Sequence, residues 1–287
     1  MQVPSRQLCD WQNPNIVIEE LMTIYGENGL IWLDGDGSKL GRWIKIAVDP
    51  IEEVCCRGLP QDINSSNPFE TLRNLKPGHW TGWLSYEAGA WIEPNGNWKP
   101  NKMATLWMAS HDPILKFDLE KNQLWVEGCN AKRIEEFTKL LKKIATKNQS
   151  HKKHKQLSSK SKEALISIHS WQWLSTKDNY SDDVIRIKEW IQNGDIFQAN
   201  LTTACTTKAP RKGSIVDIFQ RLRSHSPSPF GGMIIGGDLA QGEAVISSSP
   251  ERFLKVLPSG EIETRPIKGT RPRYQNSPNK DAEMAAE

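Results

Sequence analysis

The chain has 287 residues, a formal net charge of +3, 37% hydrophobic residues and 25% charged residues. This length is enough for one large or two smaller globular domains, and the net charge is too small to argue for a nucleic-acid partner. No apolar stretch approaches the roughly 20 residues of a membrane span, and no signal-like segment follows Met1. We therefore expect a cytoplasmic globular protein with neither a nucleic-acid nor a membrane partner.

Cysteine usage agrees with a reducing compartment. The chain has an odd number of widely scattered cysteines: Cys9, Cys55, Cys56, Cys129 and Cys205. Such a set argues against a disulfide framework, and the absence of a Cys-x-x-Cys pair argues against a structural zinc site. We predict no metal ligands in this sequence.

The amino-terminal part is predicted to contain a helix at residues 15–25, a strand at residues 30–33 and several strands between residues 80 and 127. The Asp-Gly-Asp-Gly sequence at residues 34–37 lacks the spacing of both an EF-hand loop and a dinucleotide-binding fingerprint, so we interpret it as a turn. We assign residues 1–130 to an amino-terminal domain.

A lysine-rich segment follows. The pattern is helical from Ala131 and then basic, with nine lysines between Lys139 and Lys162. A surface that binds nucleic acid or a membrane is one interpretation, and a solvated linker is the other. Because aromatic residues and arginines are not interleaved with the lysines, we favour a linker over residues 131–165.

Beyond the linker the pattern indicates a helix followed by a strand. Apolar residues recur at helical spacing at Tyr180, Val184, Ile187 and Ile191. Ser175 or Asp178 is the expected amino-terminal cap, and Gly194 suits the carboxyl-terminal end. We expect a strand at residues 196–203, with Gln198 on its polar face.

The carboxyl-terminal region is predicted to form a β-hairpin. Residues 244–247 and 252–257 resemble strands, Pro258–Gly260 is a turn, and residues 261–267 form a further strand in which Glu263 and Arg265 share one face. The hairpin brings the carboxylate of Glu251 towards Lys268. A solvated surface hairpin is the alternative, since charged hairpins are common.

Lys268 is a candidate nucleophile. Arginines precede and follow it in the sequence, and a lysine surrounded by cations is harder to protonate, which frees its amine for attack. The same positive charge would attract a small dianionic substrate. These residues therefore predict a site for an anionic small molecule.

Four segments in order resemble the chorismate-utilising enzymes, which include anthranilate synthase component I and aminodeoxychorismate synthase component I. The segments are residues 82–87 (GWLSYE), 191–201 (IQNGDIFQANL), 226–230 (SPSPF) and 249–273, which contains SPERF and TRPIKGTRPR. The resemblance covers roughly residues 80 to 273.

The resemblance implies roles for individual residues. Anthranilate synthases usually have alanine in the Pro-Ile-x-Gly-Thr motif, whereas lysine, here Lys268, is typical of aminodeoxychorismate synthases. In those enzymes the lysine is taken to attack C2 of chorismate, and Glu251 matches the general acid for the leaving C4 hydroxyl. The resemblance also implies that other residues form the substrate pocket: Gln198, Arg265, Gly269 and Thr270.

The family's fold and partners follow as expectations. We expect an α+β protein like anthranilate synthase component I, with two packed, largely antiparallel sheets flanked by helices, and we assign residues 166–287 to the first part of the catalytic domain. The resemblance implies a glutamine amidotransferase partner that supplies ammonia, and Mg²⁺ in the parent enzyme.

The carboxyl terminus leads us to expect a truncated chain. Family members continue for over a hundred residues and carry their Mg²⁺ ligands there, and residues 281–287 resemble the start of an unfinished helix. We predict an inactive fragment of an aminodeoxychorismate synthase component I. An anthranilate synthase component I, or a non-catalytic remnant that docks an amidotransferase, are the alternatives.

Overall fold

The computed structural model describes residues 4–151, 171–208 and 214–266, which fall into two compact units. The first unit contains residues 1–153 and 219–287, and the second contains residues 154–218. This division differs from the sequence-based boundaries at 130 and 165, because strands after residue 219 pair with strands from before residue 50.

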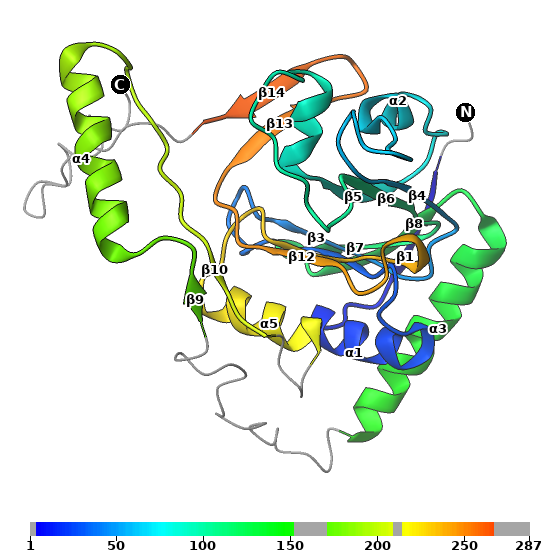
Figure 1. The fold of residues 1–287 in the computed structure, drawn as a ribbon. Helices are drawn as coiled ribbons and strands as arrows, with labels where there is room; N and C mark the ends of the chain where they lie inside the picture. Colours follow the sequence, from blue (N-terminus) through cyan, green and yellow to red (C-terminus); the bar gives the residue numbers. More distant parts are fainter. Residues whose placement is uncertain (1–3, 152–170, 209–213, 267–287) are drawn as a thin grey trace, which may run out of the picture. The chain divides into compact units, whose positions relative to one another are not determined.

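A seven-stranded sheet forms the centre of the first unit (Figure 1), and neighbouring strands are antiparallel. Its strands, in spatial order, are β1 (Ser5–Cys9), β8 (Gln123–Gly128), β7 (Ile114–Asp118), β3 (Trp43–Ala47), β2 (Ile31–Leu33), β11 (Gly232–Ile235) and β12 (Ala244–Ser247). The pairing of β2 with β11 therefore joins the amino-terminal strands to the segment that carries the predicted site motifs.

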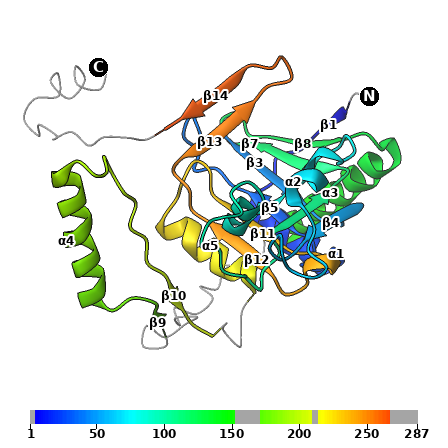
Figure 2. The same cartoon turned by 45° about the horizontal axis from the view of Figure 1, so that its top comes forward.

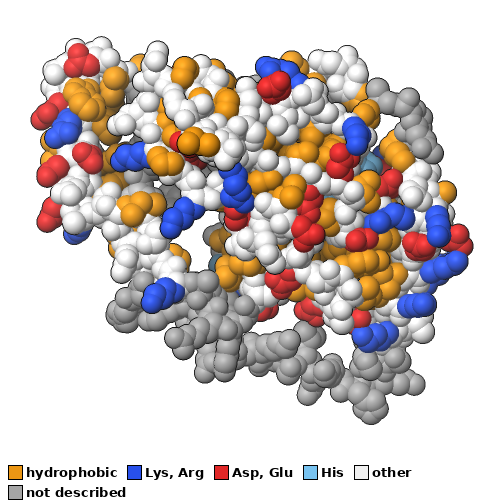
Figure 3. Space-filling model, turned by 45° about the vertical axis from the view of Figure 1, so that its right-hand side comes forward, with side chains coloured by type: hydrophobic (Ala, Val, Ile, Leu, Met, Phe, Trp, Pro, Cys, Tyr) orange, Lys and Arg blue, Asp and Glu red, His pale blue; other side chains and the backbone are white. Residues whose placement is uncertain are grey.

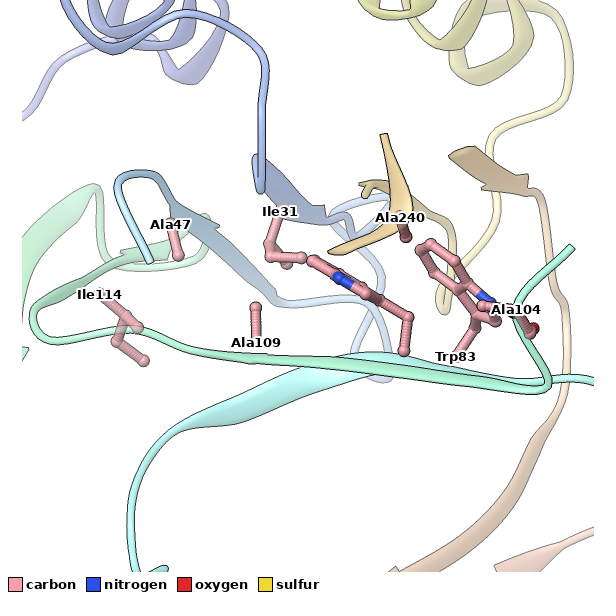
Figure 4. Packing of buried hydrophobic residues seen from close by; sticks show 8 residues of the cluster. Ile31, Ala47, Trp83, Ala104, Ala109, Ile114 and Ala240 are labelled. Carbon is pink, nitrogen blue, oxygen red and sulfur yellow. Dashed lines mark hydrogen bonds between the residues drawn. The ribbon is translucent and has the colours of Figure 1, made fainter. Parts of the chain in front are cut away.

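A second, three-stranded antiparallel sheet packs against the first. It has the order β4 (Glu52–Cys56), β6 (Leu106–Ser110), β5 (Trp80–Leu84). Residues from both sheets fill the space between them, as Figure 4 shows for Ile31, Ala109 and Trp83. Trp83 stacks on Trp107 with ring centroids 4.9 Å apart, so this core rests on large aromatic surfaces.

Helices cover the outer face of the seven-stranded sheet (Figure 1). They are α1 (Pro14–Tyr25), α3 (Ala131–His151) and α5 (Ile215–His225), of which residues 219–225 belong to this unit. The helix α2 (Pro68–Arg73) and the short 3₁₀ helix η1 (Tyr86–Trp91) lie beside β4 to β6. Local sequence explains the bounds of α1. The side chain of Asn13 accepts a hydrogen bond from the amide of Asn15, Pro14 occupies the first turn, and Gly26 ends the helix with a φ of 77°.

Two strands form a separate hairpin in the first unit (Figure 2). They are β13 (Arg252–Val256) and β14 (Ile262–Arg265), and their antiparallel pairing confirms the predicted hairpin. The amides of Leu257 and Gly260 close the turn between them, and Gly260 has a φ of 85°, which favours glycine.

The second unit contains α4 (Lys177–Asn193) and the paired two-residue strands β9 (Gln172–Trp173) and β10 (Cys205–Thr206). Gly194 ends α4 in the left-handed conformation, as predicted. The predicted cap at Ser175 or Asp178 is wrong, because Thr176 accepts the capping hydrogen bond from the amide of Asn179.

The strand expected at residues 196–203 does not form. Regular pairing in this part of the second unit begins only at Cys205, which lies opposite Trp173. A strand needs a hydrogen-bonding partner along its length, and the described residues provide none for this segment. Gln198 therefore lies on an irregular, exposed stretch rather than on a strand face.

Antiparallel sheets flanked by helices confirm the predicted α+β fold. The helix at residues 15–25, the strands between residues 80 and 127 and the helix from residue 131 are confirmed as well. Among the described residues, no helix is long and apolar enough to cross a membrane.

The face drawn in Figure 3 carries Lys and Arg side chains interspersed with Asp and Glu side chains.

Candidate functional site

Two of the sequence motifs lie against each other in the first unit. The SPSPF segment precedes β11 and the SPE segment follows β12, and the register of these strands pairs Gly232 with Ser247. The amide of Phe230 donates to the carbonyl of Ser249 at 3.2 Å, and the Ser248 hydroxyl donates to the carbonyl of Ser226 at 2.6 Å. Strand pairing thus brings together motifs that are about twenty residues apart in the sequence.

Glu251 lies between the SPSPF–SPE contact and the start of β13. The hydroxyl of Ser249 donates to the carbonyl oxygen of Glu251 at 2.9 Å, which fixes the backbone on either side of Pro250. The Glu251 residue is half-buried. Directly after it, the guanidinium of Arg252 lies over the ring of Phe230, 5.1 Å from the ring centroid. The predicted general acid is therefore held at the point where the SPSPF loop meets the hairpin.

The hairpin register places Arg252 directly opposite Arg265. From there to the next pair, Lys255 with Glu263, β13 advances by three residues and β14 by two, so β13 contains a β-bulge. The Thr264 hydroxyl donates to the carbonyl of Phe253 at 2.8 Å within the bulge. Because of the bulge, Arg252 at the start of β13 pairs with Arg265 at the end of β14.

Glu263 links the two arginines. Its Oε1 atom accepts a hydrogen bond from Nη2 of Arg252 and another from Nε of Arg265, the latter at 2.5 Å. These hydrogen bonds, that of Arg265 first, outweigh partial burial and lower the pKa of Glu263 to about 2. The bond to Glu263 also raises the pKa of Arg265.

This pairing changes the electrostatic argument made from the sequence. The sequence shows a run of arginines, from which we expected an uncompensated positive cluster around Lys268. In the structure, Arg252 and Arg265 share the negative charge of Glu263, so the three side chains together carry a net charge of +1. The attraction for an anion is weaker than the arginine count suggests, and it is more localised.

The remaining predicted site residues are distributed as follows. Lys268, Gly269 and Thr270 lie outside the described residues. Gln198 belongs to the second unit and is exposed. The structure therefore brings Glu251 and Arg265 to the same end of the hairpin.

The GWLSYE motif has a packing role in this fold. Gly82 faces Met108 across the β5–β6 pair, and a Cβ atom at Gly82 would overlap the carbonyl oxygen of Trp107. Glycine is needed there because the backbones approach closely. Trp83 is buried and donates from Nε1 to the carbonyl of Ala104 at 3.1 Å.

Sequence reasoning missed Arg252 and Glu263 as site residues. Its expectation that Glu263 and Arg265 share a face was correct, and that periodicity was the available signal. The cross-strand position of Arg252 depends on the bulge, which local pattern does not reveal. Within the described ranges, no group of three or more His, Cys, Asp or Glu side chains is placed to hold a metal ion.

The combination of sheets, helices and hairpin defines an α+β protein with the fold of anthranilate synthase component I. The structure of that protein from Streptococcus pneumoniae matches with a TM-score of 0.50 and 16% sequence identity, over 76% of this chain and 52% of that one. The family model described as chorismate binding enzyme matches residues 30–287. The chain belongs to the family of chorismate binding enzymes.

The curated relatives include proteins named as anthranilate synthase-like and as aminodeoxychorismate synthase. An anthranilate synthase component I-like protein of Synechocystis sp. is 31% identical over 69% of this chain and 38% of its own length. Aminodeoxychorismate synthase component 1 of Salmonella typhimurium is 36% identical over 40% of this chain and 24% of its own length. The chain thus aligns with less than two fifths of either relative.

Proposed function

We propose that this chain is part of an aminodeoxychorismate synthase component I, the enzyme that converts chorismate and ammonia to 4-amino-4-deoxychorismate. Lys268, in the Pro266–Thr270 motif, is the observation that carries this choice within the family. The similarity to the Salmonella typhimurium aminodeoxychorismate synthase component 1 supports it.

The proposed chemistry uses three residues in separate roles. The amine of Lys268 attacks C2 of chorismate while the carboxylic acid of Glu251 donates a proton to the departing C4 hydroxyl. Ammonia then adds at C4 and the bond between C2 and the lysine amine breaks. Arg265 binds a substrate carboxylate. Glu251 is half-buried next to the contact between the SPSPF and SPE segments, whereas Arg265 is exposed. This contrast suits a proton donor held in the fold and a cation that meets an incoming anion.

The proposal includes the partners implied by the family. A glutamine amidotransferase subunit would supply ammonia, and Mg²⁺ would bind a substrate carboxylate in the parent enzyme. Within the described ranges, the first unit offers the arginine cluster at the hairpin for a carboxylate, but no grouped metal ligands. The inactivity of the chain by itself and its cytoplasmic location stay predictions.

Anthranilate synthase component I is the second candidate. The Synechocystis relative matches a larger part of the chain, and the anthranilate synthase component 1 of Methanothermobacter thermautotrophicus is 24% identical over 99% of this chain and 60% of its own length. These alignments support the family as a whole, whereas Lys268 favours the first candidate.

Product analysis distinguishes the candidates. Chorismate consumption is measured with ammonia and Mg²⁺ for this chain and for a form extended through the next in-frame coding sequence, with Lys268→Ala beside each. We expect aminodeoxychorismate from the extended form only, and its loss in Lys268→Ala. Formation of anthranilate would support the second candidate. No consumption by either form would overturn both.

A further inference from the structure

The base of the β13–β14 hairpin contains an unfavourable pairing. Arg252 lies directly opposite Arg265, and like charges directly opposite each other on paired strands destabilise a sheet. The sequence could avoid this repulsion with a polar residue at either position. An arrangement that keeps both cations needs a compensating group and suggests a use for them.

Glu263 is that compensating group. One carboxylate oxygen accepts from Arg252 on the facing strand and from Arg265 on its own strand. The side chains of Arg252 and Glu263 are 25% and 32% exposed, while that of Arg265 is 49% exposed. In the cluster of Arg252, Glu263 and Arg265, Arg252 is therefore the more buried arginine, and Arg265 is the one accessible to a ligand.

The contact to Glu263 also orients the guanidinium of Arg265. It engages Nε, which leaves the two terminal nitrogens, and within the part of the chain that the structure describes these make no hydrogen bond to another residue. The side chain of Arg265 is 49% exposed, and its two terminal nitrogens match the spacing of a carboxylate, which arginine binds in a two-point arrangement.

We propose that Glu263 is a positioning residue that orients Arg265 to receive one carboxylate of a chorismate-type dianion. The inference rests on the proposed function, because it assigns Arg265 a substrate carboxylate. Glu263 acts through Arg265 and does not touch the substrate. Its negative charge weakens the general attraction for anions, and its hydrogen bond supplies the orientation.

These two effects predict opposite results for Glu263→Gln. Loss of the carboxylate raises the net charge of the cluster from +1 to +2, so a purely electrostatic role predicts a lower KM for chorismate. A positioning role predicts a higher KM. We expect the KM to rise about tenfold with a smaller change in kcat, equivalent to about 1.4 kcal/mol of lost binding.

The experiment compares wild type, Glu263→Gln, Glu263→Asp and Glu261→Gln at fixed ionic strength, in whichever form of the protein consumes chorismate. Glu261 is the matched control, because it is an exposed glutamate of the same hairpin, two residues away. We expect Glu263→Asp to recover most of the wild-type KM, and Glu261→Gln to leave it unchanged. Thermal unfolding of each variant tests whether the fold is kept.

The outcomes separate the two proposals. If neither form of the wild type consumes chorismate, the proposed function fails and the role of Glu263 fails with it. If the wild type is active and Glu263→Gln has an unchanged or lower KM, only the positioning role is overturned. An equal rise in KM for Glu261→Gln would also overturn it, because the effect would then not be specific to the arginine contact.

Discussion

Arg223 of α5 forms a two-point ion pair with Asp34, which lies 189 positions earlier in the chain, directly after β2. The Nε–Oδ2 and Nη2–Oδ1 distances are 2.7 and 2.9 Å. The guanidinium also lies 4.9 Å from the ring centroid of Trp32, whose Nε1 donates to Asp34. The contact ties α5 to the sheet immediately before the SPSPF loop.

We predict that Asp34→Asn destabilises the first unit by about 2–3 kcal/mol. The Asp34 side chain is only 7% exposed, so the variant leaves the guanidinium of Arg223 partly buried without its counter-charge. Urea unfolding measures the change. Glu52→Gln is the control, because the Glu52–Lys76 pair is largely exposed and should contribute less than about 1 kcal/mol. Equal losses in the two variants would contradict the prediction.

A second prediction concerns Gly82 of the GWLSYE motif. Gly82→Ala should destabilise the protein by about 2–3 kcal/mol, because the added Cβ overlaps the backbone of β6 at Trp107. The control is Gly242→Ala, where nothing lies within 4 Å and the φ of 81° alone should cost about 1 kcal/mol. Thermal unfolding compares the two variants. A smaller loss of stability in Gly82→Ala than in Gly242→Ala would contradict the prediction, because β5 and β6 would then accommodate the added methyl group.

Elements whose determinants lie close together in the sequence were predictable, whereas elements that depend on distant partners were not. The helix at residues 15–25 was predictable because its apolar spacing is local and Pro14 and Gly26 directly flank this range. The hairpin turn was predictable from Pro258–Gly260. The strand at residues 196–203 was predicted wrongly because strand formation depends on a partner, which the local pattern does not contain.

The site was predictable only in part for a related reason. Motif resemblance selected Glu251 and Arg265, and strand pairing in the structure places them at one end of the hairpin. The contact between Glu263 and Arg252 depends on the register and the bulge, which place Arg252 within hydrogen-bonding distance of Glu263. The same holds for the Asp34–Arg223 pair, since a contact across so many positions depends on the tertiary fold.

The buried histidine His111 predicts a loss of stability in mild acid. Its side chain is 1% exposed and Nε2 lies 2.9 Å from the carbonyl of Gly29. Burial lowers the pKa of His111 below its ordinary value of 6.5, with hydrogen bonds to backbone carbonyls opposing the shift. Because the unfolded chain then binds the proton more tightly, the contribution is complete above pH 6.5 and is lost as the pH falls below it.

Urea unfolding at two pH values tests this prediction. One unit below the ordinary histidine pKa, the wild type should lose up to about 1.4 kcal/mol more than His111→Gln, relative to neutral pH. His225→Gln is the control, because it replaces a histidine that is exposed at the end of α5. Identical pH profiles for wild type and His111→Gln would exclude His111 as the source.

The last prediction separates Glu251 from the arginine cluster beside it. If Glu251 donates the proton to the leaving hydroxyl, Glu251→Gln should lower kcat by about 10²–10⁴-fold, because an amide has no acidic proton to give. The KM should change little, since the proposed carboxylate contact belongs to Arg265. Arg265→Lys should give the opposite pattern, with a raised KM and a smaller loss in kcat, because lysine cannot form the two-point contact. Steady-state kinetics on the active form measures both variants. A fall in kcat of similar size for Arg265→Lys would mean that the hairpin acts as one unit, and that the division between proton donor and carboxylate binder is wrong.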